Sequence, residues 1–149
     1  MKYICILLFL IFGCSTKKSS QYLEVYYLGP NISTPMSYPC GMIADYALKD
    51  DLNYKKIDDE INFKKINTLC NRYEKVEDTT GIDARIKVII HNEGKVDTLC
   101  LGEYFNTYKN GVKVKDDKEM LDLIKKLIDY ENTIPSFIRK HPERYGIKK

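Results

Sequence analysis

The cysteines and histidines of this 149-residue chain are the residues that nucleophilic or metal chemistry would need first. Cys40, Cys70 and Cys100 form no CxxC pair, which argues against a thioredoxin-type redox motif and a zinc ribbon. A cysteine nucleophile also needs a base beside it, whereas His91 falls at a predicted hairpin end and His141 in the carboxy-terminal tail. We therefore expect no catalytic set, no metal site, no cofactor and no enzymatic activity.

The carboxylates, the glycines and the net charge argue against three further kinds of function, namely calcium binding, phosphate binding and nucleic-acid binding. The acidic clusters Asp50-Asp51, Asp58–Glu60 and Asp116-Asp117 lack the alternating ligand pattern of a calcium-binding loop, and we interpret them as turns or helix caps. The glycines are spread over predicted turns and form no phosphate-binding GxGxxG motif. A net charge of +3 is too small for an electrostatic nucleic-acid binder, so we expect no nucleic-acid partner.

The amino terminus has the pattern of an export signal. Met1-Lys2 is positively charged, and residues 3–12 form an apolar run about half the length of the roughly 20 residues that span a bilayer. The run ends in Ile11-Phe12-Gly13-Cys14, which resembles the lipobox of bacterial lipoproteins. That resemblance implies removal of residues 1–13 and attachment of a diacylglyceryl group to the Cys14 thiol.

The same resemblance predicts a location. A lipidated Cys14 would hold the protein on a membrane of the bacterial cell envelope, and Ser15 beside it fits the class delivered to the outer membrane. Residues 14–21 are small and polar, as expected of a flexible tether. In an oxidising envelope one disulfide can form among Cys40, Cys70 and Cys100, and three pairings are open.

Cys70 and Cys100 also fit as small buried hydrophobes, because the first falls among helical core positions and the second within a strand. Cys40 lies between Pro39 and Gly41, where an exposed thiol or a loop staple is expected.

The rest of the chain predicts one α+β domain over residues 22–135, followed by a basic tail over residues 136–149. Alternating apolar residues and turn signals favour a small, mostly antiparallel sheet with two helices packed on one face. Predicted strands cover residues 22–28, 53–57, 84–91, 96–103, 104–109 and 112–115. A helix is expected near 61–76, and another follows a cap at Asp116.

Two hairpin turns determine the predicted register. Glu93-Gly94 places Val88 opposite Leu99, which gathers the apolar residues of both strands on one face. Asn110-Gly111 predicts a second hairpin.

Tyrosine is the unusual enrichment, with 12 in the chain. Tyrosine supplies amphipathic contact area and is common in protein interfaces. Tyr104, Phe105 and Tyr108, near the second hairpin, are the candidate binding residues. We therefore expect a lipid-anchored, non-enzymatic envelope protein that binds another protein, for example as an immunity or inhibitor-like module. The alternatives are a small envelope enzyme that uses Cys40 and a structural accessory lipoprotein.

Overall fold

The computed structural model describes residues 21–30, 32, 36–43, 52–78 and 80–146. Within them lies one antiparallel sheet with the strand order β2-β1-β3-β4-β5-β6. The strands are β1 (Gln21–Tyr27), β2 (Asn53–Ile57), β3 (Ile86–Asn92), β4 (Lys95–Leu101), β5 (Thr107–Lys109) and β6 (Val112–Val114). The predicted signal, Cys14 and almost all of the tether lie outside these residues.

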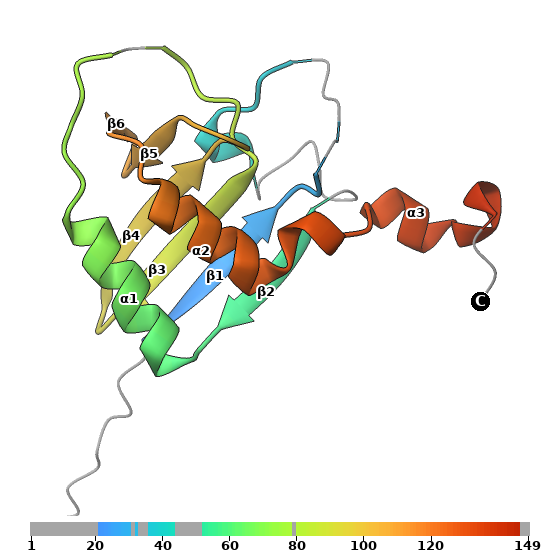
Figure 1. The fold of residues 1–149 in the computed structure, drawn as a ribbon, viewed down its shortest axis with the longest axis horizontal. Helices are drawn as coiled ribbons and strands as arrows, with labels where there is room; N and C mark the ends of the chain where they lie inside the picture. The colour runs from blue at the N-terminus through green and yellow to red at the C-terminus, as the bar shows by residue number, and fades with distance from the viewer. Residues whose placement is uncertain (1–20, 31, 33–35, 44–51, 79, 147–149) are drawn as a thin grey trace, which may run out of the picture.

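Two helices cover one face of the sheet (Figure 1). The α-helices are α1 (Glu60–Asn71), α2 (Lys118–Ile128) and the short α3 (Ser136–Lys140). The 3-10 segments are η1 (Cys40–Met42), η2 (Tyr130–Asn132) and η3 (Pro142–Tyr145). The predicted α+β class, with a mostly antiparallel sheet and α1 and α2 on one face, is confirmed.

The first hairpin has the predicted register, with Val88 opposite Leu99. Its turn residues Glu93 and Gly94 have φ values of 51° and 90°, the positive values that a two-residue turn between twisted strands requires. The turn at Asn110-Gly111 is also present, although the strands that it joins are shorter than predicted.

Both long helices begin at an aspartate cap. The carboxylate of Asp59 accepts a hydrogen bond from the backbone N–H of Asn62 at 2.8 Å, which satisfies one free donor of α1. For α2 the predicted cap, Asp116, is wrong by one residue: Asp117 accepts from the N–H of Met120. Asp116 instead accepts a hydrogen bond from the Thr107 hydroxyl at 2.9 Å.

The helix predicted near 61–76 ends earlier, at Asn71. The following residues pair with the edge of the sheet: the N–H of Val76 donates to the carbonyl of Lys113, and the N–H of Lys115 donates to that of Glu74. Lys75 and Val114 form an isolated antiparallel bridge. Pairing with β6 thus replaces the last helical turn.

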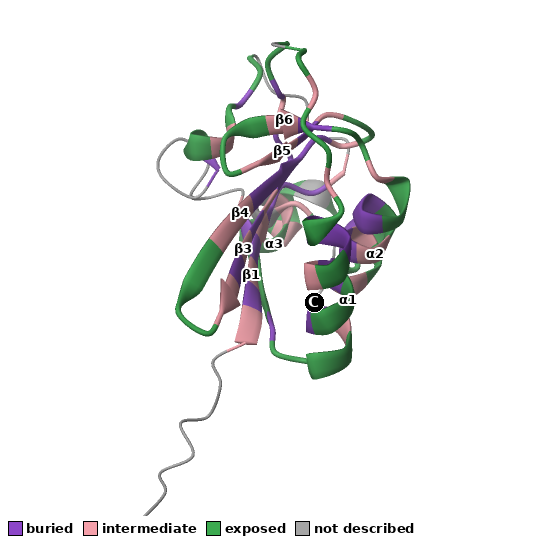
Figure 2. Ribbon diagram, turned by 90° about the vertical axis from the view of Figure 1, so that its left-hand side faces the viewer, coloured by how far each residue is buried: buried purple, intermediate pink, exposed green. Residues whose placement is uncertain are grey.

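The main core lies between the sheet and the two helices, where buried residues line both inner surfaces (Figure 2). Its fully or nearly fully buried members include Leu23, Val25, Phe63, Ile66, Ile86, Val88, Ile90, Leu99, Met120 and Ile124. A smaller cluster packs on the opposite face of the sheet and contains Ile43, Ile82, Ala84 and Cys100. The central strands β3 and β4 thus contribute to the main core on one face, and Cys100 of β4 belongs to the smaller cluster on the other.

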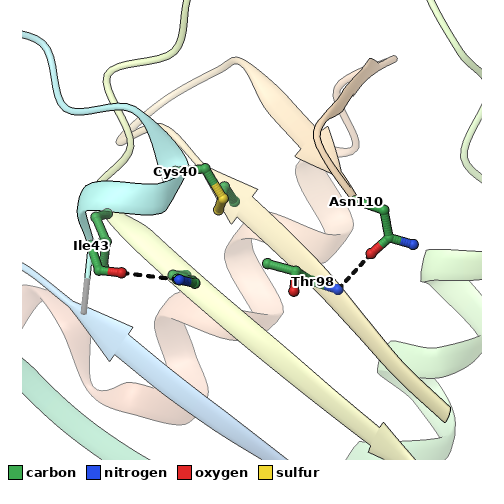
Figure 3. The surroundings of a disulfide bond; sticks show 6 residues. Cys40, Ile43, Thr98 and Asn110 are labelled. Carbon is green, nitrogen blue, oxygen red and sulfur yellow. Dashed lines mark hydrogen bonds between the residues drawn. A yellow bond between two sulfur atoms is a disulfide. The ribbon is translucent and has the colours of Figure 1, made fainter. Parts of the chain in front are cut away.

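A disulfide links the smaller cluster to the sheet. It joins Cys40 in η1 to Cys100 in β4, one of the three pairings left open (Figure 3). The Lys87 ammonium donates to the carbonyl of Ile43 at 3.2 Å. The segment around η1 is therefore held on the face of the sheet that the long helices leave open.

Candidate functional site

A cleft lies between α2 and the loop that joins β4 to β5. Its volume is about 390 Å³. Tyr104 and Phe105 line it and are 70% and 65% exposed, unusually high for large aromatic side chains. The other lining residues are Leu101, Gly102, Glu103, Thr107, Asp116, Asp117, Lys118, Leu121, Asp122 and Lys125.

The loop over residues 102–106 is closed by its own backbone. The N–H of Gly102 donates to the carbonyl of Asn106 at 3.0 Å, and Asn106 has a φ of 68°. A Cβ atom at Gly102 would lie 2.1 Å from the carbonyl oxygen of Phe105, which leaves no room for a side chain. This tight closure brings Tyr104 and Phe105 to the outside of the loop.

Among the charged side chains that line the cleft, the acidic ones outnumber the basic ones. Four carboxylates and two ammonium groups give a net charge of −2, in a chain whose net charge is +3. Lys118 forms an ion pair with Asp122 one turn later. Lys125 lies 5.2 Å from the centre of the Tyr104 ring and 3.6 Å from a carboxylate oxygen of Glu131. One cation–π contact thus positions the Tyr104 ring at the wall of the cleft.

The side chain of Tyr130 is buried behind this wall of the cleft. It is 1% exposed, and its ring centre lies 4.8 Å from the Lys125 ammonium. Burial, followed by the charge of Glu103, raises the pKa of the Tyr130 phenol above its ordinary value. Within the described part of the chain, its hydroxyl has no hydrogen-bond partner.

Tyr108, the third candidate binding residue, does not join the other two. It lies in β5 opposite Cys100 and packs against the smaller core cluster, on the face away from α2. Its hydroxyl donates to the carbonyl of Thr80. The strand alternation explains the separation, because Tyr108 points away from the helices whereas Tyr104 and Phe105 belong to the loop before the strand.

The described cysteines offer no exposed thiol. Cys40 and Cys100 are joined, and Cys70 is buried on α1. Burial raises the pKa of the Cys70 thiol, which disfavours the nucleophilic thiolate. Neither histidine lies beside a cysteine: His91 contacts Glu24, and His141 lies 3.6 Å from Glu143 in the tail.

A second group of side chains, not predicted as a cluster, lies on the sheet face away from α1 and α2. We call it the outer patch, and its members are Tyr22, Glu24, Tyr26, Tyr54, Lys56, Ile89, His91 and Val96. The alternation of side chains along β1 and β3 is enough to place some of these residues on one face. The order of the strands in the sheet is what brings residues from four strands together on it.

The outer patch is held by contacts between neighbouring strands. His91 Nε2 lies 2.8 Å from one oxygen of Glu24, and the Tyr54 hydroxyl donates to the other at 3.2 Å. The Tyr22 ring stacks on His91 with ring centres 4.2 Å apart, and Lys56 lies 4.3 Å from the centre of the Tyr22 ring. The only carboxylate of the patch is therefore satisfied within it.

In residues 21–146, apart from the gaps given above, no group of three metal-ligating side chains is placed to hold an ion. In the same residues no helix has the length and apolar character needed to cross a membrane.

No protein-family model, curated protein or solved structure matches the chain.

Proposed function

We propose that this protein is a lipid-anchored module of the bacterial cell envelope that binds a protein partner through the cleft beside α2. The observation that carries the proposal is the exposure of Tyr104 and Phe105 on one wall of that cleft. Exposed aromatic side chains beside a hollow are typical anchors of protein interfaces. The anchor itself rests on the lipobox that ends at Cys14.

The position of the cleft supports this arrangement. Gln21 pairs with Asn92 at one end of the sheet, the end at which the chain leaves the tether. Ile86 pairs with Leu101 at the opposite end, and the cleft loop follows Leu101 directly. A protein held by Cys14 would therefore carry its cleft at the end of the sheet remote from the tether.

A non-enzymatic role accords with the surroundings of the cysteines. Cys40, the thiol on which the alternative enzyme depends, is joined to Cys100, and Cys70 is buried. We keep the immunity or inhibitor-like role as the specific form of the proposal. An accessory role in an envelope assembly is the alternative form, and the identity of the captured partner separates the two.

The binding proposal is tested by capture from detergent-solubilised envelopes. The wild-type protein should recover a stoichiometric partner, and Tyr104→Ala with Phe105→Ala should lose it, because truncating central aromatic anchors typically costs at least about 2 kcal/mol, or roughly thirtyfold in affinity. Ile61→Ala is the matched control, since Ile61 is 78% exposed on α1. Equal recovery by the double variant and the control would refute a role for the cleft.

The anchor is tested separately by metabolic labelling with a radioactive fatty acid. The wild-type chain should incorporate label and fractionate with membranes, whereas Cys14→Ala should lose the label and retain residues 1–13. An unchanged mass and unchanged membrane partitioning of that variant would refute the lipoprotein assignment.

A further inference from the structure

The outer patch has the composition of a surface that meets a membrane interface. Tyr54 and Val96 are 52% and 55% exposed, and Tyr22, Tyr26 and Ile89 are partly exposed beside them. Tyrosine is enriched at the level of lipid headgroups, because its ring is apolar while its hydroxyl hydrogen-bonds to water and headgroups. The patch thus combines aromatic and aliphatic surface at one site.

The charges of the patch permit such a contact. Glu24 is engaged by both His91 and Tyr54, so no free carboxylate faces outward from the patch. Lys56 is exposed and lies over the Tyr22 ring. An exposed lysine ammonium beside an aromatic ring is suited to contact with anionic headgroups.

The start of β1 places this patch within reach of the lipid. Cys14 precedes Gln21 by seven residues (21 − 14), which span at most about 25 Å when fully extended. Tyr22, a member of the patch, follows Gln21 directly. Anchoring therefore makes contact between patch and bilayer an intramolecular event, and a weak surface interaction is sufficient to populate it.

The cleft is unsuited to the same contact. The cleft lies beside α2 on the other face of the sheet, and its lining carries a net charge of −2. An anionic membrane surface repels this lining more strongly than the outer patch. This difference between the cleft and the patch favours the orientation with the patch toward the lipid and the cleft away from it.

We propose that the outer patch docks on the phospholipid surface to which Cys14 attaches the protein, so that the cleft faces away from the membrane. This inference rests on the proposed lipid anchor. It adds a second contact with the membrane and a defined orientation of the domain.

The absence of tryptophan from the chain provides a direct test. The mature lipidated protein is reconstituted in vesicles of phosphatidylcholine and phosphatidylglycerol with brominated acyl chains, which quench nearby tryptophan. The tryptophan of Val96→Trp should be quenched at least about threefold more strongly than that of Phe105→Trp, because docked aromatic groups reach the headgroup and acyl boundary. Tyr54→Trp provides the same readout if Val96→Trp does not fold.

A charge variant tests the contribution of Lys56. In the Val96→Trp background, Lys56→Gln should reduce the ratio of docked to undocked protein by about fivefold, the effect of one lysine near an anionic surface. Lys126→Gln on the exposed side of α2 removes the same charge and should leave the quenching unchanged.

The outcomes separate this inference from the anchor on which it rests. Failure of the wild-type protein to float with the vesicles overturns the anchor and the docking together. Flotation with equal quenching in Val96→Trp and Phe105→Trp overturns the docking alone and leaves the anchor intact.

Discussion

Removal of the disulfide is the perturbation whose effect the structure defines best. Cys40 and Cys100 are separated by 60 residues, and the bond joins η1 to the centre of the sheet. Backbone contacts also hold this segment: the N–H of Ala84 donates to the carbonyl of Tyr38 at 2.8 Å. We therefore expect the Cys40→Ala, Cys100→Ala double variant to keep its native fold but with lower stability.

The loop length determines the expected magnitude. Closing a loop of this size lowers the entropy of the unfolded chain by about 14 cal/mol/K, which corresponds to roughly 4 kcal/mol at 25 °C. In a domain of this size such a loss lowers the melting temperature by roughly 15 °C.

Urea unfolding followed by circular dichroism measures this difference, with the oxidised wild type as reference. Reduction of the wild type should reproduce the stability of the double variant. Cys70→Ala is the control, because it removes a buried thiol without breaking the bond and should cost only about 1 kcal/mol. Equal stability of the oxidised wild type and the double variant, or a mapped bond that includes Cys70, would refute the reasoning.

Three further predictions concern the cleft, its helix and an edge contact. Asp117→Ala removes the cap of α2 and should lower the free energy of unfolding by about 1 kcal/mol in urea unfolding, whereas Asp117→Asn should restore most of it. Gly102→Ala should displace the cleft loop, because the new Cβ meets the carbonyl of Phe105; unchanged partner capture and unchanged backbone chemical shifts of the loop would contradict this. A hydrogen bond from Lys113, supplemented by two from Thr80, lowers the pKa of Asp78 from its ordinary value of 3.8 to about 2. The ionised Asp78 carboxylate therefore contributes its full stabilisation above pH 3.8, and this stabilisation is lost as the pH falls through about 2. Lys113→Met should move that pKa back toward 3.8 in an NMR titration, and an unmoved pKa would count against the contact.

Local patterns predicted the centre of the fold because they act between neighbouring residues. A two-residue turn at Glu93-Gly94 determines the register of its hairpin, and the alternation along β3 then decides which side chains are buried. The helix near 61–76 was predicted too long because its periodicity continues to Tyr73. The contact that ends it, between residues 74–76 and β6, joins segments distant in the sequence.

The grouping of the three candidate binding residues differs from the prediction for the same reason. Tyr104 and Phe105 share a loop, so their common exposure follows from local structure. Tyr108 lies only three residues beyond Phe105, yet strand alternation turns it to the other face. The outer patch was missed because Tyr54 and His91 meet Glu24 only after β2, β1 and β3 have paired.

The disulfide and the cleft are mechanically connected through β4. Cys100 points to one face of this strand, while Leu101 beside it lines the cleft on the other. Residues 102–106 begin directly after Leu101, and the N–H of Arg85 donates to the carbonyl of Leu101 at 2.8 Å. The end of β4 is therefore held by the disulfide on one face and by a backbone hydrogen bond in the plane of the sheet, just before the chain turns into the loop that bears Tyr104 and Phe105. A rigid support lowers the entropy lost when exposed aromatic side chains are immobilised by a partner. Under the proposed function, the disulfide would therefore favour binding as well as stability, although its sulfur atoms lie on the opposite face of the sheet.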